Sequence, residues 1–295
     1  MEKIKGLQIE GVEFRLGVSL ERYTTIRLQA KGSFAICQTE LSLIKLIQKL
    51  NELEVDYHLV GWGANQVLKS NNNLLFIKLN FSFDETVFEK EKNNFVLPAS
   101  TPLNRLSSIA QKYGFKGWEA FTGIPASLGG AICMNAGTAL GEIGKLIKTV
   151  KILKKEGEIF YYKCNDTSFN YRSNNFLKRG DIILSAEVVH EGIDHEVKNK
   201  IKQYLDYRKE TQPLTTKNCG SVFKNLPNFR AGEIIDGIGL KGFGLENIHV
   251  SFMHANFIEN NGTGTSDEFV ELIHELSEEI ERISGLKFEF EVKVY

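Results

Sequence analysis

The first 80 residues carry the pattern of a small β/α unit. From Thr39 to Glu54, apolar residues return every three or four positions and Thr39 can cap the first turn, which predicts a surface helix packed on a sheet. Short apolar runs at 56–60 and 74–79 predict two strands, and a glycine turn at 61–65 follows the first of them. The buried face of the helix is expected to consist of Leu43, Ile44, Ile47 and Leu50.

The middle of the chain alternates between strand and helix patterns. A strand at 95–97 precedes a helix that begins at Pro102, because proline suits the first helical position. The segments 149–153 and 158–162 alternate around a Lys-Lys-Glu-Gly turn and predict a hairpin, and 181–189 predicts a further strand. The helix after the proline is expected to bury Leu103, Leu106, Ile109 and Ala110.

The last third ends in two clear patterns. A long amphipathic helix is expected to be capped by Ser266 and stopped by Gly285. After it, from Phe288 to Val294, apolar residues alternate with charged ones, which predicts a strand with one apolar and one polar face. The apolar side of the helix is formed by Phe269, Val270, Ile273, Leu276, Ile280 and Ile283.

Composition narrows the class of protein. The 295 residues are 42% hydrophobic and 25% charged, which suits two or three modest domains of a soluble protein, and the formal net charge of −1 predicts no nucleic-acid partner. No apolar stretch approaches the ~20 residues that cross a bilayer and the amino terminus has no apolar leader, so no membrane association and a cytosolic location are expected. The six histidines lack ligand spacing, so no metal is expected. Four cysteines without a CxxC pair are expected to be reduced and mostly packed: Cys37, Cys133, Cys164 and Cys219.

The densest chemical signal is Thr-Gly-Ile-Pro-Ala-Ser-Leu-Gly-Gly-Ala at 122–131. Adjacent glycines let backbone N–H groups converge on an anion without obstruction by Cβ, which suits a diphosphate. The segment lacks the Gly-Lys-Ser/Thr of a Walker loop, and Gly-Trp-Gly at 61–63 lacks the third glycine of the dinucleotide fingerprint, so a Rossmann domain is not expected. A lone glycine cluster more often only forms tight turns, but two clusters favour one elongated dinucleotide in an interdomain cleft.

Residues 123–137 resemble the flavin-binding signature of the UDP-N-acetylenolpyruvoylglucosamine reductase family. Six further motifs of that family occur in the family's order. They are Tyr-Thr-Thr-Ile-Arg at 23–27, Gly-Trp-Gly-Ala-Asn at 61–65, Tyr-Arg-Ser at 171–173, Gly-Ser-Val-Phe-Lys-Asn at 220–225, Gly-Leu-Lys-Gly at 239–242 and His-Ala-Asn-Phe at 254–257.

The resemblance implies an α+β fold. A two-part FAD-binding domain of the vanillyl-alcohol-oxidase (PCMH) type would occupy 1–80 and 81–205, and a smaller α+β substrate-binding domain would occupy 206–295. The last boundary falls near an amphipathic helix expected at 196–208. The direct passage after Tyr-Arg-Ser resembles the shorter form of the family, which lacks a tyrosine-bearing insertion. A monomer is expected.

The resemblance also implies a reaction in peptidoglycan precursor synthesis. NADPH passes hydride to FAD, and the reduced flavin delivers it to the enolpyruvyl ether of UDP-GlcNAc to give UDP-N-acetylmuramate. Negative charge then develops beside the substrate carboxylate, so the site needs a cation and an acid. The family positions match Arg172 as that cation, Ser221 as the proton donor and Glu291 as its assistant, with Glu289 as the alternative if the alignment slips by one pleat. Judged singly, an arginine or a serine is more often a surface or turn residue, and only the motif context favours catalysis.

Further positions are implied as binding residues, and two alternatives remain. Gln29 and Ala30 stand where the family usually has glycines, and Ala64 where it usually has a hydroxyl, whose loss costs about 1 kcal/mol of flavin binding. The alternatives are another FAD oxidoreductase of the same superfamily and an inactive, flavin-free sugar-nucleotide-binding homologue. For FAD the implied residues are Thr25, Arg27, Gly61, Gly63, Ala64, Asn65, Thr122, Gly123, Ile124, Pro125, Ser127, Gly129, Gly130, Asn135 and Gly137. For the UDP-sugar they are Lys224, Asn225, Arg208, Gln212, His254 and Asn256.

Overall fold

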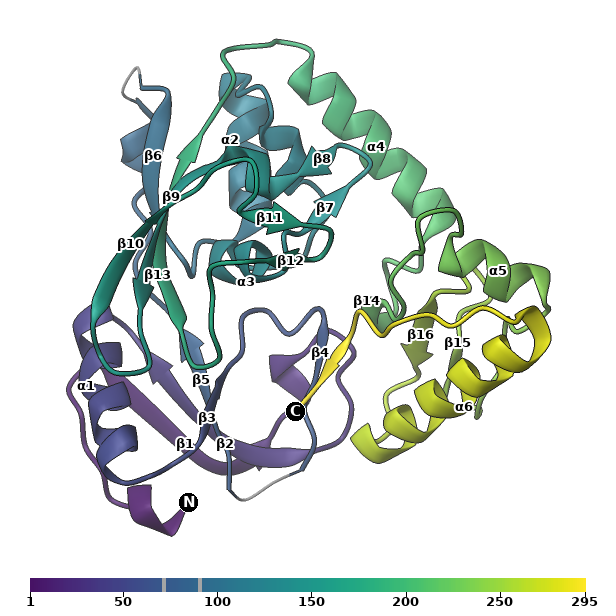
Figure 1. The fold of residues 1–295 in the computed structure, drawn as a ribbon, viewed down its shortest axis with the longest axis horizontal. Coiled ribbons are helices and arrows are strands. Elements are labelled where there is room, and N and C mark those ends of the chain that lie inside the picture. The colour runs from purple at the N-terminus through teal and green to yellow at the C-terminus, as the bar shows by residue number, and fades with distance from the viewer. Residues whose placement is uncertain (71–72, 90–91) are drawn as a thin grey trace. The chain divides into compact units, whose positions relative to one another are not determined.

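The computed structural model describes residues 1–70, 73–89 and 92–295, and their contacts group into two units (Figure 1). The chain passes between the units several times, whereas the sequence predicted three contiguous domains. Both predicted flavin-binding subdomains contribute to the first unit. Unit 1 comprises 1–16, 33–61 and 73–206, and unit 2 comprises 17–32, 62–72 and 207–295.

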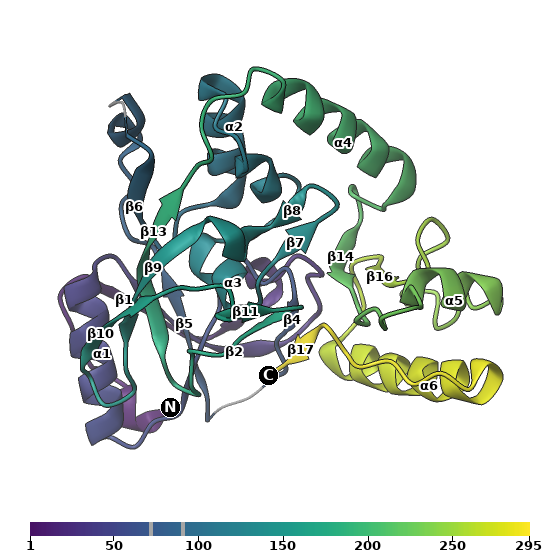
Figure 2. The same cartoon turned by 45° about the horizontal axis from the view of Figure 1, so that its top comes forward.

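Two amino-terminal segments group with the carboxy-terminal part because their hydrogen bonds lead there. Asn260 Nδ2 donates to Ile26 O at 2.8 Å. The short strand β4 (Gln66–Val67) runs parallel to β17 (Lys293–Val294) within unit 2, as Figure 2 shows. These paired residues are more than two hundred positions apart in the sequence. Sequence periodicity reports only local structure, so it could not predict that distant segments belong to one unit.

The first sheet of unit 1 confirms the predicted β/α pattern. Its strand order is β1-β2-β5-β3, and β5 runs parallel to both of its neighbours. The helix α1 begins after Thr39, whose hydroxyl and Ser42 form a capping box, and it buries Leu43, Ile47 and Leu50. The bounds are β1 Val12–Ser19, β2 Lys31–Cys37, α1 Glu40–Glu52, β3 Tyr57–Leu59 and β5 Leu75–Leu79.

The second sheet of unit 1 is antiparallel, in the order β10-β9-β13-β6, and it confirms the predicted hairpin. The helices α2 and α3 share one core with this sheet, around Trp118 and Phe121. Pro102 proves to be the N-cap of α2 and not its first helical residue, because its ψ of 132° is extended. The bounds are β6 Asn94–Pro98, α2 Leu103–Tyr113, α3 Leu128–Cys133, β9 Ile147–Leu153, β10 Ile159–Lys163, β13 Ile182–Val189 and α4 Val197–Thr211.

Unit 2 contains a three-stranded antiparallel sheet in the order β14-β16-β15. The cap of α6 is Thr265 and not Ser266, since the Thr265 hydroxyl accepts from Glu268 N in a capping box. The helix stops at Gly285 as predicted, but Ile283 is 43% exposed and lies outside its buried face. The bounds are β14 Lys217–Ser221, α5 Ala231–Gly237, β15 Ile248–Val250, β16 Phe257–Asn260 and α6 Ser266–Ser284.

The predicted strand at 288–294 is regular only at its end, in β17. Phe290 first forms an antiparallel bridge with Phe223, and the chain then continues as a parallel partner of β4. A change of partner and direction interrupts the ladder. The predicted alternation nevertheless survives, because Phe288 and Val292 are buried while Glu289 is exposed.

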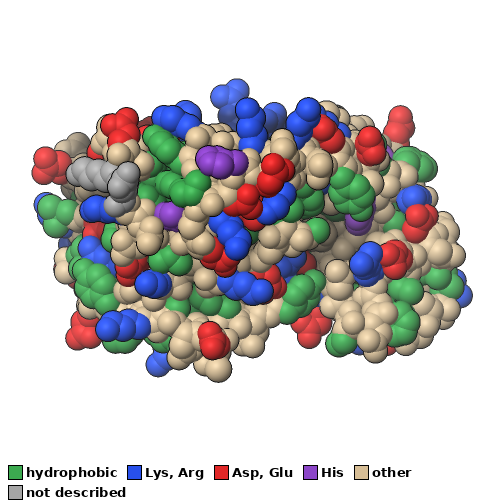
Figure 3. All heavy atoms as spheres, turned by 90° about the horizontal axis from the view of Figure 1, so that it is seen from above, with side chains coloured by type: hydrophobic (Ala, Val, Ile, Leu, Met, Phe, Trp, Pro, Cys, Tyr) green, Lys and Arg blue, Asp and Glu red, His purple; other side chains and the backbone are tan. Residues whose placement is uncertain are grey.

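The surface carries both signs of charge. Basic and acidic side chains are interspersed over the face that Figure 3 shows. None of the helices in the described residues has the length and apolar character needed to span a bilayer.

All four cysteines are free thiols. Cys37 and Cys219 are buried and Cys164 is half-buried. Cys133 is exposed at the end of α3, so it is the exception to the predicted, mostly packed cysteines.

His58 in β3 makes the stability of the fold depend on pH. Burial lowers the pKa of its imidazole from 6.5 to about 4. Since the folded pKa lies below the unfolded one, folding favours the neutral ring. The stability that depends on the neutral His58 ring is fully present above about pH 6.5 and is lost as the pH falls toward 4. The loss in the free energy of unfolding amounts to about 3 kcal/mol.

We therefore expect His58→Gln to flatten the acid limb of the stability curve. Between pH 6.5 and 4, the free energy of unfolding in urea should fall by up to about 3 kcal/mol less in His58→Gln than in the unmodified protein. The exposed His195 supplies a matched control, and His195→Gln should follow the unmodified protein. Parallel curves for His58→Gln and the unmodified protein would contradict this assignment.

Candidate active site

The two glycine-rich segments meet within unit 1. A Cβ built on Gly61 would lie 3.0 Å from Ser127 Oγ, so the first segment touches the second at the start of α3. Ser127 caps that helix by accepting from Gly130 N at 3.4 Å. A Cβ on Gly129 would lie 2.7 Å from Ala99 Cβ. Glycine at these positions therefore allows the backbones to approach closely.

The first amides of α3 are already used inside the protein. Leu128 N donates to Thr101 O and Gly129 N donates to Ala99 O, both at 2.8 Å. Gly130 N likewise donates to Ser127 Oγ, but Gly130 is exposed, and a Cβ there would meet only Ser127 Oγ, at 3.4 Å. This Cβ-free surface fits the close approach of a diphosphate.

The loop before α3 carries the next group of predicted flavin residues. Thr122 is buried, and its hydroxyl lies 2.8 Å from Ser107 Oγ. Gly123 has a φ of +74°, a conformation that favours glycine. Ile124 O accepts from Ala126 N at 2.9 Å, and Pro125 is exposed at the tip. The loop is a tight turn whose backbone faces outward only around 123–125.

A second group of predicted flavin residues gathers in unit 2. Gly63 has a φ of +63°, and a Cβ there would lie 2.2 Å from Tyr23 O. Thr25 N donates to Gly63 O at 3.2 Å, so the 23–27 and 61–65 motifs lie side by side. The Thr25 hydroxyl donates to Asn218 O at 2.7 Å, while Arg27 is exposed with a φ of +54°. The threonine therefore ties this group to β14.

The end of the same loop lies beside the proposed proton donor. A Cβ built on Gly220 would lie 3.9 Å from Ala64 O, directly before Ser221. Asn65 Nδ2 donates to Glu291 O at 3.0 Å. Sequence motifs that are more than 150 positions apart thus meet in one part of unit 2.

Arg172 lies at the tip of a short hairpin in unit 1. The hairpin consists of β11 (Phe169–Asn170) and β12 (Ser173–Asn174). Arg172 has a φ of +53°, and its Nη2 donates to Gly137 O at 3.0 Å. A left-handed conformation costs a non-glycine residue on the order of 1 kcal/mol and persists where the surroundings enforce it. The guanidinium is therefore held in place.

Asn135 is the residue that enforces this hairpin. It is 1% exposed with a φ of +43°. Its Nδ2 donates to Asn170 O at 3.0 Å and to Glu142 Oε2 at 3.1 Å, and its Oδ1 accepts from Gly144 N at 3.0 Å. The side chain predicted to bind flavin is thus engaged in holding the Arg172 hairpin. No pattern in the sequence singled out Asn170 or Glu142.

Ser221 ends β14, and Glu291 lies beside it. Glu291 N donates to Val222 O at 2.7 Å, so the two proposed catalytic residues belong to paired segments. Burial raises the pKa of the Cys219 thiol to about 12, and the negative charge of Glu291 contributes to the rise. The Glu291 carboxylate is therefore close enough to influence β14.

The alternative residue, Glu289, lies elsewhere. Its carboxylate pairs with Lys224 Nζ at 2.7 Å, which lowers the pKa of Glu289, and its side chain is 78% exposed. Lys224 N also donates to Glu289 O at 2.8 Å. This register places Glu291, and not Glu289, across from the residue that follows Ser221.

The remaining predicted substrate residues all lie in unit 2. Arg208 Nε donates to Gln212 Oε1 at 2.7 Å at the end of α4. Asn225 Oδ1 accepts from Ala231 N at 3.0 Å at the start of α5. Burial lowers the pKa of His254, whose Nδ1 accepts from Asn256 N at 3.2 Å. An imidazole with a lowered pKa stays neutral at neutral pH.

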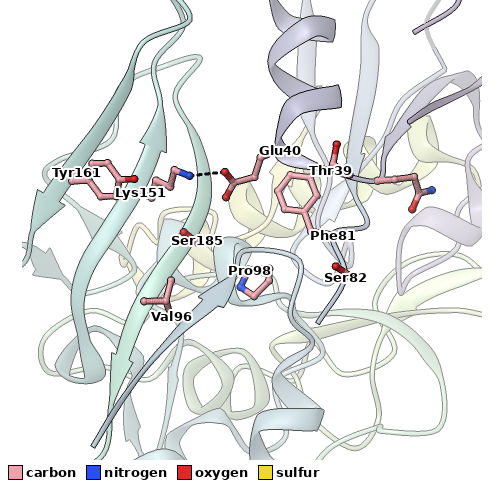
Figure 4. Close-up of a pocket in the computed structure, with 10 residues that line it drawn as sticks. Thr39, Glu40, Phe81, Ser82, Val96, Pro98, Lys151, Tyr161 and Ser185 are labelled. Atoms are coloured by element: carbon pink, nitrogen blue, oxygen red, sulfur yellow. Dashed lines mark hydrogen bonds and ion pairs between the residues drawn. The ribbon is translucent and has the colours of Figure 1, made fainter. Parts of the chain in front are cut away.

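A cavity of about 430 Å³ opens elsewhere in unit 1, and none of the predicted site residues lines it. Figure 4 shows Lys151 and Glu40 pointing toward each other across it, and they form an ion pair at 2.5 Å. The hydrogen bond to Glu40 raises the pKa of Lys151, so the two charges satisfy each other. Among the described residues, no three His, Cys, Asp or Glu side chains gather as a metal site requires.

Two family models match the chain. One, described as the FAD binding domain, matches residues 33–162. The other, described as the C-terminal domain of UDP-N-acetylenolpyruvoylglucosamine reductase, matches residues 212–295. Together they confirm the predicted α+β class with a flavin-binding part followed by a smaller domain.

Full-length relatives carry the same description. The chain is 30% identical to a UDP-N-acetylenolpyruvoylglucosamine reductase of Halalkalibacterium halodurans, over 100% of this chain and 97% of the relative. It is 29% identical to one from Streptococcus pneumoniae, over 97% and 95%. The crystal structure of UDP-N-acetylenolpyruvylglucosamine reductase from Thermus caldophilus superposes with a TM-score of 0.80 at 29% identity, covering 96% of this chain and 98% of that one.

The glycines of α3 allow a test that separates a tight turn from a ligand surface. Gly129→Ala should lower the stability by about 1–3 kcal/mol, because its Cβ would overlap Ala99. Gly130→Ala has room for its Cβ, so its stability should stay within about 0.5 kcal/mol of the unmodified protein. It should nevertheless weaken FAD binding by about tenfold or more, because its methyl group covers the surface proposed for the diphosphate.

Thermal unfolding of the flavin-free protein and titration with FAD, followed by flavin fluorescence, measure the two effects separately. Unchanged FAD affinity in a stable Gly130→Ala protein would mean that the glycine pair only shapes the turn.

Proposed function

The chain belongs to the UDP-N-acetylenolpyruvoylglucosamine reductase family, and we propose that it reduces UDP-N-acetylglucosamine enolpyruvate to UDP-N-acetylmuramate with NADPH as the hydride source. The observation that carries this proposal is the similarity over 100% of the chain. A flavin-free homologue is not favoured, because the FAD-binding match spans 33–162. Another FAD oxidoreductase is not favoured either, since the C-terminal match is specific to this family.

When bound, FAD would supply the hydride-transfer chemistry between NADPH and the substrate, and residues within 33–162 would hold it. Arg172 is proposed to stabilise the negative charge that develops beside the substrate carboxylate during the reaction. A guanidinium suits this role, because it is planar, always charged and able to bind a carboxylate through two parallel hydrogen bonds. The bond from Arg172 Nη2 to Gly137 O supports the role, since it fixes one side of the fork.

Ser221 is proposed as the proton donor for the carbanion. A serine hydroxyl is a poor acid in water, so the proton moves only as negative charge develops next to it. Glu291 assists from the segment that pairs with Val222. The backbone bond from Glu291 N to Val222 O supports this role, because it brings Glu291 beside the end of β14.

The finer assignments follow the family. We assign FAD binding to the region around 33–162 and UDP-sugar binding to 212–295, where Lys224 is the leading candidate for the diphosphate. The product enters peptidoglycan precursor synthesis, so the proposal extends to cell-wall biogenesis, cell shape and cell division. We place the activity in the cytoplasm, in a monomer.

The role of Ser221 separates the two half-reactions. In Ser221→Ala, reduction of the flavin by NADPH should be nearly unchanged, because that step needs no proton donor to carbon. Reoxidation by the enolpyruvyl substrate should slow by about 100-fold or more, the contribution of a general acid. Anaerobic stopped-flow absorbance measures both rates.

The same change at the half-buried Ser277 on α6 should leave both rates unchanged. Equal losses in the two half-reactions of Ser221→Ala would exclude it as the proton donor.

A further inference from the structure

The side chain of Asn256 binds both backbone polar groups of one residue, Phe223. Its Oδ1 accepts from Phe223 N and its Nδ2 donates to Phe223 O, both at 2.9 Å. Asn256 is 4% exposed and Phe223 is 1% exposed, so both bonds are shielded from water. The amide therefore replaces a strand partner at a point where the sheet has none.

The backbone of Asn256 extends the same contact. Val222 N donates to Asn256 O at 2.9 Å, one residue after Ser221. β14 ends at Ser221, so these three bonds take over where the regular ladder of β14 and β16 stops. Asn256 thus holds one side of the chain directly after the proposed proton donor.

The opposite side of the same segment is held by the irregular stretch 289–291, which precedes β17. Val222 O accepts from Glu291 N at 2.7 Å, and Lys224 N donates to Glu289 O at 2.8 Å. The Phe223 ring packs on Phe290 with centroids 5.3 Å apart. Residues 222–224 therefore lie between Asn256 on one side and the segment carrying Glu291 on the other.

We propose that Asn256 is a positioning residue, which fixes the Ser221 hydroxyl relative to Glu291 by clamping the backbone N–H and C=O of Phe223, and that it does not contact the substrate. This inference rests on the proposed roles of Ser221 and Glu291. It replaces the expectation from the sequence that Asn256 binds the UDP-sugar. A buried amide whose oxygen and nitrogen both serve the backbone is unsuited to reach a ligand.

Asn256→Asp tests the clamp with almost no change in volume. The carboxylate still accepts from Phe223 N, but it presents an acceptor to Phe223 O, where the amide presented a donor. The resulting displacement of the Phe223 backbone, and with it Ser221, should slow reoxidation of the flavin by the enolpyruvyl substrate by about 10–100-fold. NADPH-driven reduction and the Kd of the substrate, measured from the flavin spectrum, should stay within about twofold of the unmodified enzyme.

Asn261→Asp is the matched control. It makes the same change in the same unit, but the exposed Asn261 uses only its Oδ1, which accepts from Thr263 N and Oγ1, so a carboxylate can replace it. Both half-reactions should be unchanged in this variant. A rise of tenfold or more in the substrate Kd of Asn256→Asp, with reoxidation intact at saturation, would overturn the proposal and restore a substrate contact.

The unmodified protein gives a second test that does not depend on how the variant folds. The side-chain amide protons of Asn256 and the N–H of Phe223 should exchange slowly with solvent, and the Asn256 side-chain resonances should not shift on addition of UDP-GlcNAc-enolpyruvate. Fast exchange or a substrate-induced shift of these signals would contradict the clamp. If the unmodified enzyme fails to reoxidise its flavin with this substrate, the proposed function itself is wrong, which is a different outcome.

Discussion

Asparagine side-chain amides that bind backbone groups are the interaction on which the proposed active site depends. A backbone N–H or C=O that leaves a helix or sheet inside a protein needs another partner, and an unsatisfied one costs about 1–3 kcal/mol. The asparagine amide supplies one acceptor and one donor group, so it can serve as a short piece of strand. Such amides act beside each proposed catalytic residue: Asn135 near Arg172, Asn256 near Ser221 and Asn65 near Glu291.

The proposed reaction explains why the backbone beside the three catalytic residues must be held in position. The proposed catalytic residues lie at a hairpin tip, at the end of a strand and in an irregular segment, where few ladder hydrogen bonds define the backbone. A proton donor or a cation displaced by about 1 Å loses much of its effect on the transition state. Arg172 also holds a left-handed φ of +53°, which persists only in rigid surroundings. The asparagine amides therefore fix the backbone at places where secondary structure alone does not.

Local periodicity predicted only part of the regular elements, since it did not predict β1, β2, α3, α5 or the sheet of β14, β16 and β15. The helices α1, α2 and α6 and the β9–β10 hairpin follow from patterns within 20 residues, although the caps of α2 and α6 are off by one residue. The segment 288–294 changes partner halfway, which no alternation can reveal. For the site, motifs supplied the candidate residues, but they could not tell that the Asn135 and Asn256 side-chain amides bind backbone groups. Orientation depends on contacts that only the fold creates.

Anaerobic absorbance of the purified, FAD-loaded protein tests the central claim most directly, with NADPH added first and UDP-GlcNAc-enolpyruvate second. We expect NADPH to bleach the flavin and the enolpyruvyl substrate to restore its yellow colour. A flavin that NADPH reduces but the substrate does not reoxidise, or a protein that does not bind FAD, would contradict it.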